Sequence, residues 1–399
     1  MKFAHLADCH IGSWREPVLR DAGMKAFSKA VEICIERKVD FILISGDLFN
    51  TSLPAIDKLK EVTSDLKKLK DGGIPVYVIA GSHDFSPSGK TMIDVLEKAG
   101  LVANVVKGNV DEKNILHLNF TVDKKTGAKI TGMLGKKGML ERRFYENLDI
   151  GELEKESGYK IFMFHTAISE FKPEDMDKME SAPLSILPKN FNYYAGGHVH
   201  FVFRGSEKGY GTIVYPGALF PNNFRELEKF GFGGFYIIDR ENIERIPVKI
   251  HDVQRIAIDC ENMSPAQANS ELMKEIESND FSNSIVTIRL KGTLAEGRPS
   301  DIDFKSAVSR LTEKGAVAVQ RNTYSLGSKQ FESVRVSGSV ESVEEKLLEE
   351  HAGQLGIGKE ELKKIMGALA IDKADGEKTA DFEARLFENA SNVILNKTK

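Results

Sequence analysis

The sequence predicts an α/β protein: a two-sheet α/β sandwich, then a small α/β unit and a helical C-terminal segment. The N-terminal quarter of the chain alternates short apolar strands with amphipathic helices. We expect strands at 2–7, 40–45 and 75–80, with helices at 20–37 and 54–70 between them. This alternation is typical of a parallel sheet with helices packed on its faces.

The later segments predict the rest of the architecture. Short strands between glycine and asparagine turns follow as far as residue 250, so the first domain is expected at 1–250. A smaller unit is expected at 251–339, where Ser264 and Gln267 form the capping box of a helix. Residues 340–399 carry apolar residues at helical spacing, which predicts a helical arm. The arm could be a local helical bundle or a partner-binding surface, and the sequence leaves both open.

Composition and charge narrow the class of protein. The 399 residues are 41% hydrophobic and 29% charged, which is typical of a globular protein with a buried core. The net charge of −4 excludes a global basic excess, so any contact with nucleic acid would need a local patch. Three widely spaced cysteines argue against a disulfide framework and suit a reducing cytoplasm. The first residues are typical of a strand, not a signal peptide, and no apolar run reaches the ~20 residues of a membrane span.

Five short segments place metal-ligating residue types just after predicted strands. They are Asp8-Cys9-His10, Gly46-Asp47, Gly81-Ser82-His83-Asp84, His165 and Gly197-His198-Val199-His200. Asp8 and His10 are two residues apart, as are His198 and His200. This spacing points both side chains of a pair to one side of an extended backbone. A lone histidine at a strand end is more often structural, but the joint pattern indicates a site. Imidazole and carboxylate ligands together suit Mn²⁺, Fe or Zn²⁺.

In this order the segments resemble the signature of calcineurin-like metallophosphoesterases. In detail they are similar to the SbcD-type nuclease subunit of the double-strand-break repair complex. The similar stretches are Phe3-x-His5-x-Ala7-Asp8-x-His10-x-Gly12, Gly46-Asp47-Leu48-Phe49 and Tyr215-Pro216-Gly217. The resemblance has specific motifs over residues 1–250. Beyond them it is architectural only, and it implies a capping, DNA-binding domain at 251–339 and helices at 340–399 that bind an SMC-like ATPase.

The resemblance implies a centre with two divalent metal ions, expected to be Mn²⁺. One ion would be held by Asp8, His10 and His200, and the other by His165, His198 and Ser82. Asp47 would bridge the two ions. His83 would protonate the leaving oxygen or stabilise the phosphoryl charge, and Asp84 would orient His83.

The implied function is a Mn²⁺-dependent DNA endonuclease and 3′–5′ exonuclease that processes double-strand breaks. Its partners would be DNA ends, an SbcC-type SMC-like coiled-coil ATPase and a second copy of the chain. It would act in the cytoplasm in association with the nucleoid, away from membranes. Two alternatives stay open: a metallophosphoesterase acting on phosphoproteins or cyclic nucleotides, and a structural DNA-end tether with a weakened metal site. The tether rests on two departures from the family, Ser82 in place of Asn and Asn50 in place of His.

A basic segment at 123–143 lies outside these motifs. It holds Lys124, Lys125, Lys129, Lys136, Lys137, Arg142 and Arg143 against two acidic residues. It could be a solvated hairpin or a patch that contacts phosphates. No aromatic residues interleave with the basic ones, so base stacking is not expected.

The remaining candidate residues are expected to be structural. His5 is expected to be buried behind the site, and Cys9 to be a packed thiol that points away from the ligands on either side of it. His117, His251 and His351 fit no ligand spacing.

Overall fold

The computed structural model describes residues 1–86, 91–176, 178–329, 359–373 and 379–395. The chain divides into two compact units, Met1–Ser328 and Lys329–Lys399. The expected domain boundary at residue 339 lies outside the described residues, as does His351.

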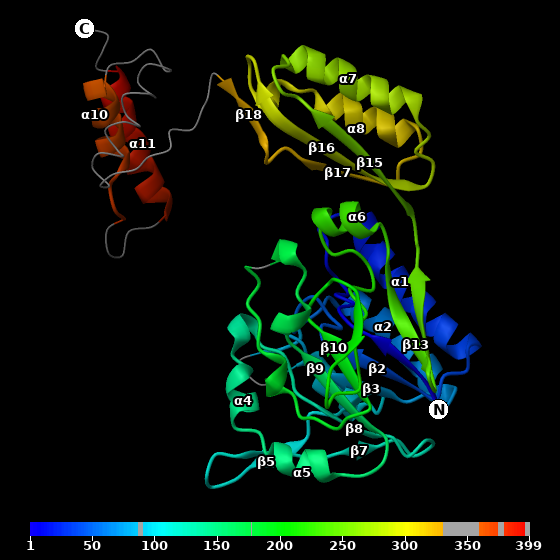
Figure 1. Cartoon of the computed structure of the whole chain (residues 1–399). Helices are drawn as coiled ribbons and strands as arrows, with labels where there is room; N and C mark the ends of the chain where they lie inside the picture. Colours follow the sequence, from blue (N-terminus) through cyan, green and yellow to red (C-terminus); the bar gives the residue numbers. More distant parts are fainter. Residues whose placement is uncertain (87–90, 177, 330–358, 374–378, 396–399) are drawn as a thin grey trace. The chain divides into compact units, whose positions relative to one another are not determined.

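The first sheet of the larger unit has six strands with the N-terminal strand near its centre (Figure 1). In spatial order they are β14 (Asn242–Val248), β13 (Gly233–Asp239), β1 (Lys2–Leu6), β2 (Phe41–Ser45), β3 (Val76–Ile79) and β4 (Ala103–Asn104). Strands β1 to β4 run parallel, and β13 and β14 continue the sheet antiparallel. Every residue of β2 is buried, as expected for a parallel strand covered on both faces.

Three helices cover the outer face of this sheet. They are α1 (Pro17–Glu36), α2 (Ile56–Asp71) and α3 (Met92–Lys98). Pro17 stands in the first turn of α1, where its missing N–H costs nothing. The helices share one apolar cluster with the sheet, including Phe27, Leu66 and Ile44.

The second sheet also has six strands. In spatial order they are β11 (Phe203–Ser206), β12 (Thr212–Tyr215), β10 (Tyr193–Gly197), β9 (Lys160–His165), β8 (Lys129–Gly132) and β7 (Thr121–Val122). The four inner strands are parallel and the two edge strands antiparallel. The short helices α4 (Arg142–Glu146) and α5 (Ile150–Lys155) follow β8, and the hairpin β5 (Gly108–Val110) and β6 (Leu116–Leu118) precedes the sheet in sequence.

The two sheets pack face to face through a shared apolar layer. Phe3 and Leu43 of the first sheet and Ile161, Met163 and Tyr193 of the second belong to it, all at most 1% exposed. The rings of Phe3 and Tyr193 meet edge to face at 5.2 Å. The expected two-sheet α/β sandwich is therefore confirmed.

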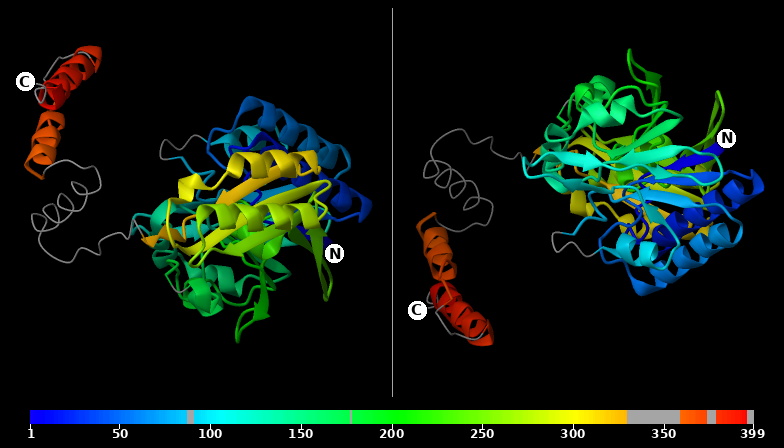
Figure 2. Two further views of the ribbon diagram at one scale, coloured as in Figure 1. Left: turned by 90° about the horizontal axis from the view of Figure 1, so that it is seen from above. Right: turned by 90° about the horizontal axis from the view of Figure 1, so that it is seen from below.

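A smaller sheet completes the larger unit, with β15 (Asp252–Asp259), β16 (Ser284–Leu294), β17 (Ala318–Asn322) and β18 (Leu326–Ser328). The helices α7 (Pro265–Ser278) and α8 (Phe304–Glu313) lie side by side on it (Figures 1 and 2). The capping box expected for Ser264 and Gln267 is present. Glu228, on helix α6 (Phe224–Phe230), pairs with Arg289 of β16 at 2.6 Å and so ties this sheet to the sandwich.

The C-terminal unit contains helices α10 (Lys359–Leu369) and α11 (Thr379–Leu395), which pack against each other. The side chain of Phe387 nevertheless remains 74% exposed. Among the residues that the structure describes, no helix is long and apolar enough to cross a membrane.

Candidate metal centre

The loops that follow β1 and β2 run together beyond the edge of the sheet. The amide of Asp8 donates to Gly46 O at 3.1 Å, and that of His10 donates to Asp47 O at 2.9 Å. Asp8, His10 and Asp47 all hold positive φ, at 50°, 43° and 51°. Non-glycine residues in this region carry strain of order 1–3 kcal/mol each unless their surroundings fix them. The interloop hydrogen bonds supply that constraint and turn the side chains toward one another.

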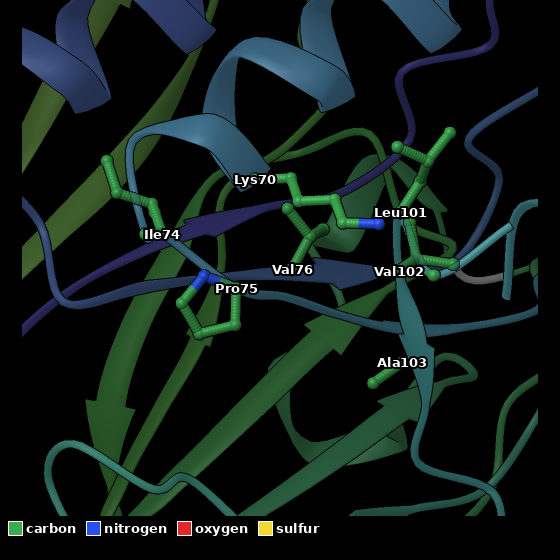
Figure 3. A pocket seen from close by; sticks show the side chains of 9 residues that line it. Lys70, Ile74, Pro75, Val76, Leu101, Val102 and Ala103 are labelled. Carbon is green, nitrogen blue, oxygen red and sulfur yellow. The ribbon is translucent and has the colours of Figure 1, made fainter.

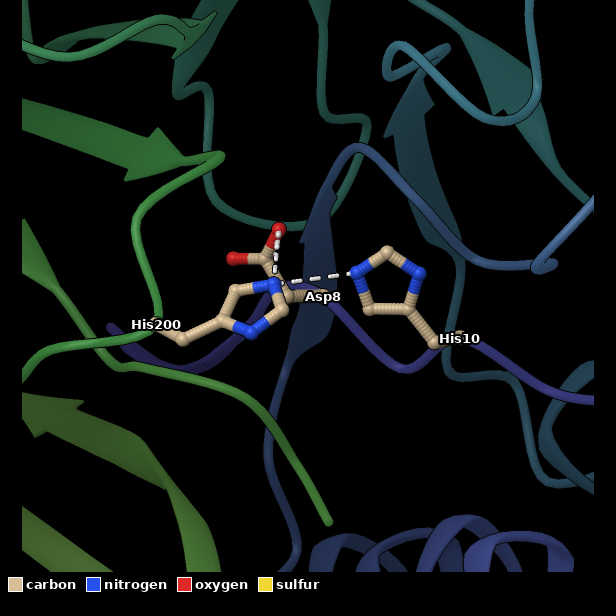
Figure 4. Close-up of side chains that lie close together, drawn as sticks. All are labelled: Asp8, His10 and His200. Carbon is tan, nitrogen blue, oxygen red and sulfur yellow. Dashed lines mark hydrogen bonds and ion pairs between the residues drawn. The ribbon is translucent and has the colours of Figure 1, made fainter. Parts of the chain in front are cut away.

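Asp8, His10 and His200 form the first group of donor atoms (Figure 4). The Nε2 atoms of His10 and His200 are 3.1 Å apart, and His200 Nε2 lies 3.9 Å from Asp8 Oδ1. The backbone amide of His198 donates to both oxygens of Asp8. Two imidazole nitrogens and a buried carboxylate that converge in this way can hold one cation. These are the three residues expected to hold the first metal.

Asp47 lies between this group and the next. Its Oδ2 is 3.7 Å from His10 Nε2 and 3.2 Å from His165 Nε2. Asp47 joins Asp8 and His165 in one set of donors within 4.8 Å of one another, and His10 and His83 in another. Asp8 is also shared by two sets, but it is the Asp47 Oδ2 atom that lies within 3.7 Å of both His10 Nε2 and His165 Nε2. A carboxylate placed between two ligand sets in this way suits a bridging ligand.

The second expected ligand set is brought together in part. Ser82 is 7% exposed, and its hydroxyl donates to Asp47 Oδ2 at 3.5 Å. His198 belongs to none of the donor groups found among the described residues. Its ring instead lies edge to face against that of His165, with centroids 5.2 Å apart. His198 is therefore beside the centre, and its ligand role stays a prediction.

His165 shows that the site suits a divalent cation. Its Nδ1 donates to Ser45 O at 2.8 Å, which fixes the ring and leaves Nε2 directed at the carboxylates. That Nε2 is buried and makes no hydrogen bond among the described residues, although Asp47 Oδ2 lies 3.2 Å from it as an ion-pair partner. Burial lowers the pKa of His165, but the charge of Asp47 outweighs it and raises the pKa to about 10. A metal ion at Nε2 would displace the proton that this raised pKa holds on the ring, and would then satisfy both the nitrogen and the carboxylate.

Two glycines make the close approach of these loops possible. Gly46 has a φ of +86°, and a Cβ atom there would lie 2.2 Å from His165 Nδ1. A Cβ atom on Gly81 would lie 2.3 Å from the backbone nitrogen of Asp47. Any larger residue at either position would push Asp47 and His165 apart.

The charges of His10, His198 and the two carboxylates suit metal binding directly. Burial lowers the pKa of His10 to about 3 and that of His198 to about 4, so both imidazoles are neutral near pH 7. Burial raises the pKa of Asp47, but His165 outweighs it and keeps the pKa well below its usual range. Burial raises the pKa of Asp8 to about 6. Neutral imidazole and ionised carboxylate are the forms that bind metal ions.

Glu226 is a candidate site residue that the sequence did not reveal. Its Oε1 accepts a hydrogen bond from His200 Nδ1 at 2.7 Å. Burial lowers the pKa of His200, but the hydrogen bond to Glu226 and the charge of Asp8 raise it to about 9. A carboxylate on the far nitrogen of a ligating histidine fixes its ring and tautomer. No motif marks Glu226, because the contact spans 26 residues.

The expected contact between Asp84 and His83 is corrected by the structure. The Asp84 carboxylate accepts hydrogen bonds from the backbone amides of Leu48, Phe49 and Gly81 at 2.9–3.1 Å. It therefore clamps the loop after β2 to the loop after β3. His83 Nδ1 instead meets the backbone carbonyl of Asn50 at 2.9 Å. The main chain at position 50 orients His83, whichever side chain that position carries.

The residues expected to be structural lie outside the donor groups of the described structure. His5 Nδ1 is 3.0 Å from the hydroxyl of Tyr193 between the sheets, and burial lowers the His5 pKa to about 3. Cys9 is 2% exposed and packs in the apolar cluster beneath the helices. Burial raises the pKa of its thiol well above the usual value, which agrees with a packed thiol. His117 lies 3.1 Å from Asp149, and His251 lies 2.9 Å from Asn283.

A cavity of about 300 Å³ lies elsewhere, at the start of β3 (Figure 3). Lys70 is the charged residue of its lining, which is otherwise built from Gly73, Ile74, Pro75, Val76, Gly100, Leu101, Val102 and Ala103. The ligand loops follow the opposite ends of β1, β2 and β3. The cavity therefore takes no part in the metal centre.

The fold and these donor groups define a metal-binding phosphoesterase. The chain belongs to the calcineurin-like phosphoesterase family, whose pattern matches residues 1–202. It is similar to proteins named DNA double-strand break repair protein Mre11 from three archaea. The protein of Archaeoglobus fulgidus is 30% identical over an alignment that covers 57% of this chain and 52% of the relative. That of Methanococcus maripaludis is 27% identical, with 66% of this chain and 68% of the relative aligned. That of Methanocaldococcus jannaschii is 29% identical, with 69% of this chain and 73% of the relative aligned. The matching region thus spans about half of the Archaeoglobus protein.

Proposed function

We propose that this protein is a two-metal phosphodiesterase that cleaves DNA at double-strand breaks. The observation that carries the proposal is the position of Asp47, whose Oδ2 atom lies 3.7 Å from His10 Nε2 and 3.2 Å from His165 Nε2 and so stands between two donor sets. The relatives named for double-strand-break repair support DNA as the substrate. Because the matching region covers only part of them, substrate and partners remain part of the proposal.

When bound, two divalent ions, for which we propose Mn²⁺, would activate a water molecule and polarise the phosphate. The chain's own groups hold this arrangement in place. Asp47 keeps the two ligand sets together, and Glu226 and the Ser45 carbonyl fix the rings of His200 and His165. His83 lies within 4.8 Å of donors on His10 and Asp47. There it can stabilise charge on the phosphate or protonate the leaving oxygen.

The proposed partners are an SMC-like ATPase and a second copy of the chain. Phe387 offers an exposed apolar side chain on the C-terminal helices, as binding to an SMC-like ATPase would require. Leu53 and Ile56 before and at the start of α2, and Val95 on α3, are 73%, 83% and 55% exposed. A homodimer that covered these side chains would remove their apolar surface from water, and we propose one on that ground. Acting on chromosomal DNA would place the complex at the nucleoid, and the smaller domain, of which the larger unit contains Asp252–Ser328, would act as the capping domain.

The experiment measures hydrolysis of two substrates, duplex DNA and a small phosphodiester, by the full chain in the presence of Mn²⁺. Blunt-ended duplex DNA labelled at the 3′ or the 5′ end would be cleaved, and shortening from the 3′ end would support 3′–5′ polarity. Bis(4-nitrophenyl) phosphate reports the metal centre alone, and Asp47→Asn is the inactive control. Hydrolysis of the small diester without DNA cleavage would favour another phosphoester substrate. DNA binding without hydrolysis of either substrate would favour a structural tether.

A further inference from the structure

The fold divides the basic segment 123–143 between the two ends of the second sheet. Lys129 stands opposite Lys160, the first residue of β9, in the register of the sheet. Lys125 forms an ion pair with Asp40, the residue before β2. These lysines therefore lie at the end remote from the metal centre. Strand β8 runs parallel to β9, so the residues after Gly132 emerge at the end where His165 stands. The segment is thus not one patch.

The residues of the basic segment that follow Gly132 lie directly against His165, a candidate metal ligand. A Cβ atom on Gly135 would be 2.4 Å from His165 Cδ2, so the backbone of residue 135 rests on that imidazole ring. The amide of Gly135 also donates to Ala80 O at 2.9 Å, beside the loop that carries Ser82 and His83. Lys136 is the next residue and begins the cationic stretch.

Lys136 is held by two aromatic rings. Its ammonium lies 4.8 Å from the ring centroid of Phe85 and 4.3 Å from that of Phe144. Its backbone amide donates to Glu141, which is 2% exposed. Phe85 follows Asp84 in the active-site loop, so the fold supplies aromatic neighbours that residues 123–143 lack by themselves. Cation–π contacts of this kind position a lysine without neutralising it.

The neighbouring cations are exposed and have no carboxylate partner in the described part of the chain. Arg142 pairs with Glu146 at 3.1 Å, whereas no ion pair involves Lys136, Lys137 or Arg143 among the described residues. Lys137 and Arg143 are both exposed. Lys137 adjoins Lys136 in the chain, and Arg143 adjoins Phe144, whose ring lies under the Lys136 ammonium. In a chain whose net charge is −4, these three cations therefore form a local positive surface.

We propose that Lys136, Lys137 and Arg143 form a phosphate-binding surface that holds the DNA backbone next to the scissile phosphodiester. This rests on the proposed function and adds the residues that position the strand. Lys136 is fixed by the two phenylalanines, and the other two cations reach non-reacting phosphates. These contacts are independent of sequence and sensitive to salt.

The test uses the full chain. DNA binding is measured with Ca²⁺ in place of the active metal, and DNA cleavage is measured with Mn²⁺. Lys137→Gln with Arg143→Gln removes two cations and leaves the Lys136 contact with the rings intact. Lys124→Gln with Lys125→Gln removes two cations from the same segment at the remote end. The slope of log affinity against log salt for a short duplex should fall by about 1.8 in the first variant, about 0.9 per lost phosphate contact. It should change little in the second.

Kinetics provide the second readout. The first variant should have a higher KM for DNA, an unchanged kcat and unchanged hydrolysis of bis(4-nitrophenyl) phosphate. Adding Lys136→Gln should lower the slope further. Equal slopes for the two double variants, or a kcat loss shared with the small diester, would overturn the surface while leaving the DNA nuclease intact. A natural protein that hydrolyses the small diester but does not bind DNA would overturn both proposals.

Discussion

Glu226→Gln tests whether the carboxylate behind His200 strengthens metal binding. The hydrogen bond from His200 Nδ1 to Glu226 Oε1 is 2.7 Å long, and the Glu226 side chain is only 11% exposed. A hydrogen bond to a charged group contributes about 1.5–3 kcal/mol, against about 0.5–1.5 kcal/mol for a neutral one. Glutamine keeps an acceptor but loses the charge, so binding at this site should weaken by about 1–2 kcal/mol, roughly five- to thirtyfold.

The assay is a calorimetric Mn²⁺ titration with Glu228→Gln as the matched control. Glu228 stands on the same helix and loses the same charge, but it binds Arg289 and no ligand histidine. Glu226 also accepts from the amide of Asn222, so Tm is recorded for both variants. We expect weaker binding of one ion in Glu226→Gln only. Unchanged affinity would refute the role given to Glu226, and an equal loss in Glu228→Gln would trace the effect to the seating of helix α6.

Three further substitutions test individual roles at the centre. Asp47→Asn should abolish hydrolysis and lower the metal stoichiometry while circular dichroism shows a folded protein; activity with both ions bound would remove Asp47 from the bridging position. His83→Gln should keep metal and DNA affinity and cut kcat by roughly 10²–10⁴-fold, the range for lost proton transfer; loss of an ion on titration would make His83 a ligand instead. Ser82→Asn should tighten the weaker of two Mn²⁺ sites by roughly 1–2 kcal/mol, because an amide oxygen reaches further than a hydroxyl. Two equal, tight sites in the natural protein would contradict this.

Local patterns predicted much of the fold. The strand expected at 40–45 is observed at Phe41–Ser45, and the helix expected at 54–70 at Ile56–Asp71. These elements have strong apolar periodicity or clear helix caps, and both signals come from residues that are close together in the sequence. The start of α1 at Pro17 was missed by three residues, although a proline followed by Val18 and Leu19 is a sequence signal for a helix first turn. The pairing of β13 with β1 joins distant parts of the chain, and local patterns do not contain that information.

The same distinction applies to the candidate site. The strand-end positions of Asp8, His10 and His200 predicted that they share a site, because strand ends meet at one edge, and the family resemblance assigned the three to one ion. The contacts of Asp84 and Glu226 depend on loop geometry that no spacing encodes. Asp84 was expected to orient its neighbour His83, but its carboxylate is closer to three backbone amides and clamps the loops. Side chains that act through tertiary hydrogen bonds need the fold before they can be identified.

The positive φ angles in the metal centre affect how a library of variants at these positions should be scored. Asp8, His10, Asp47 and His198 have φ of 50°, 43°, 51° and 86°. Asparagine and glycine enter this region readily, whereas β-branched residues are genuine outliers there. Saturation mutagenesis will therefore yield two kinds of inactive protein. Asparagine or glycine should leave cellular abundance near normal and remove only the ligand, while valine or isoleucine should also deform the loop and lower abundance. Activity scores must be divided by abundance before any of these positions is ranked by its contribution to the chemistry.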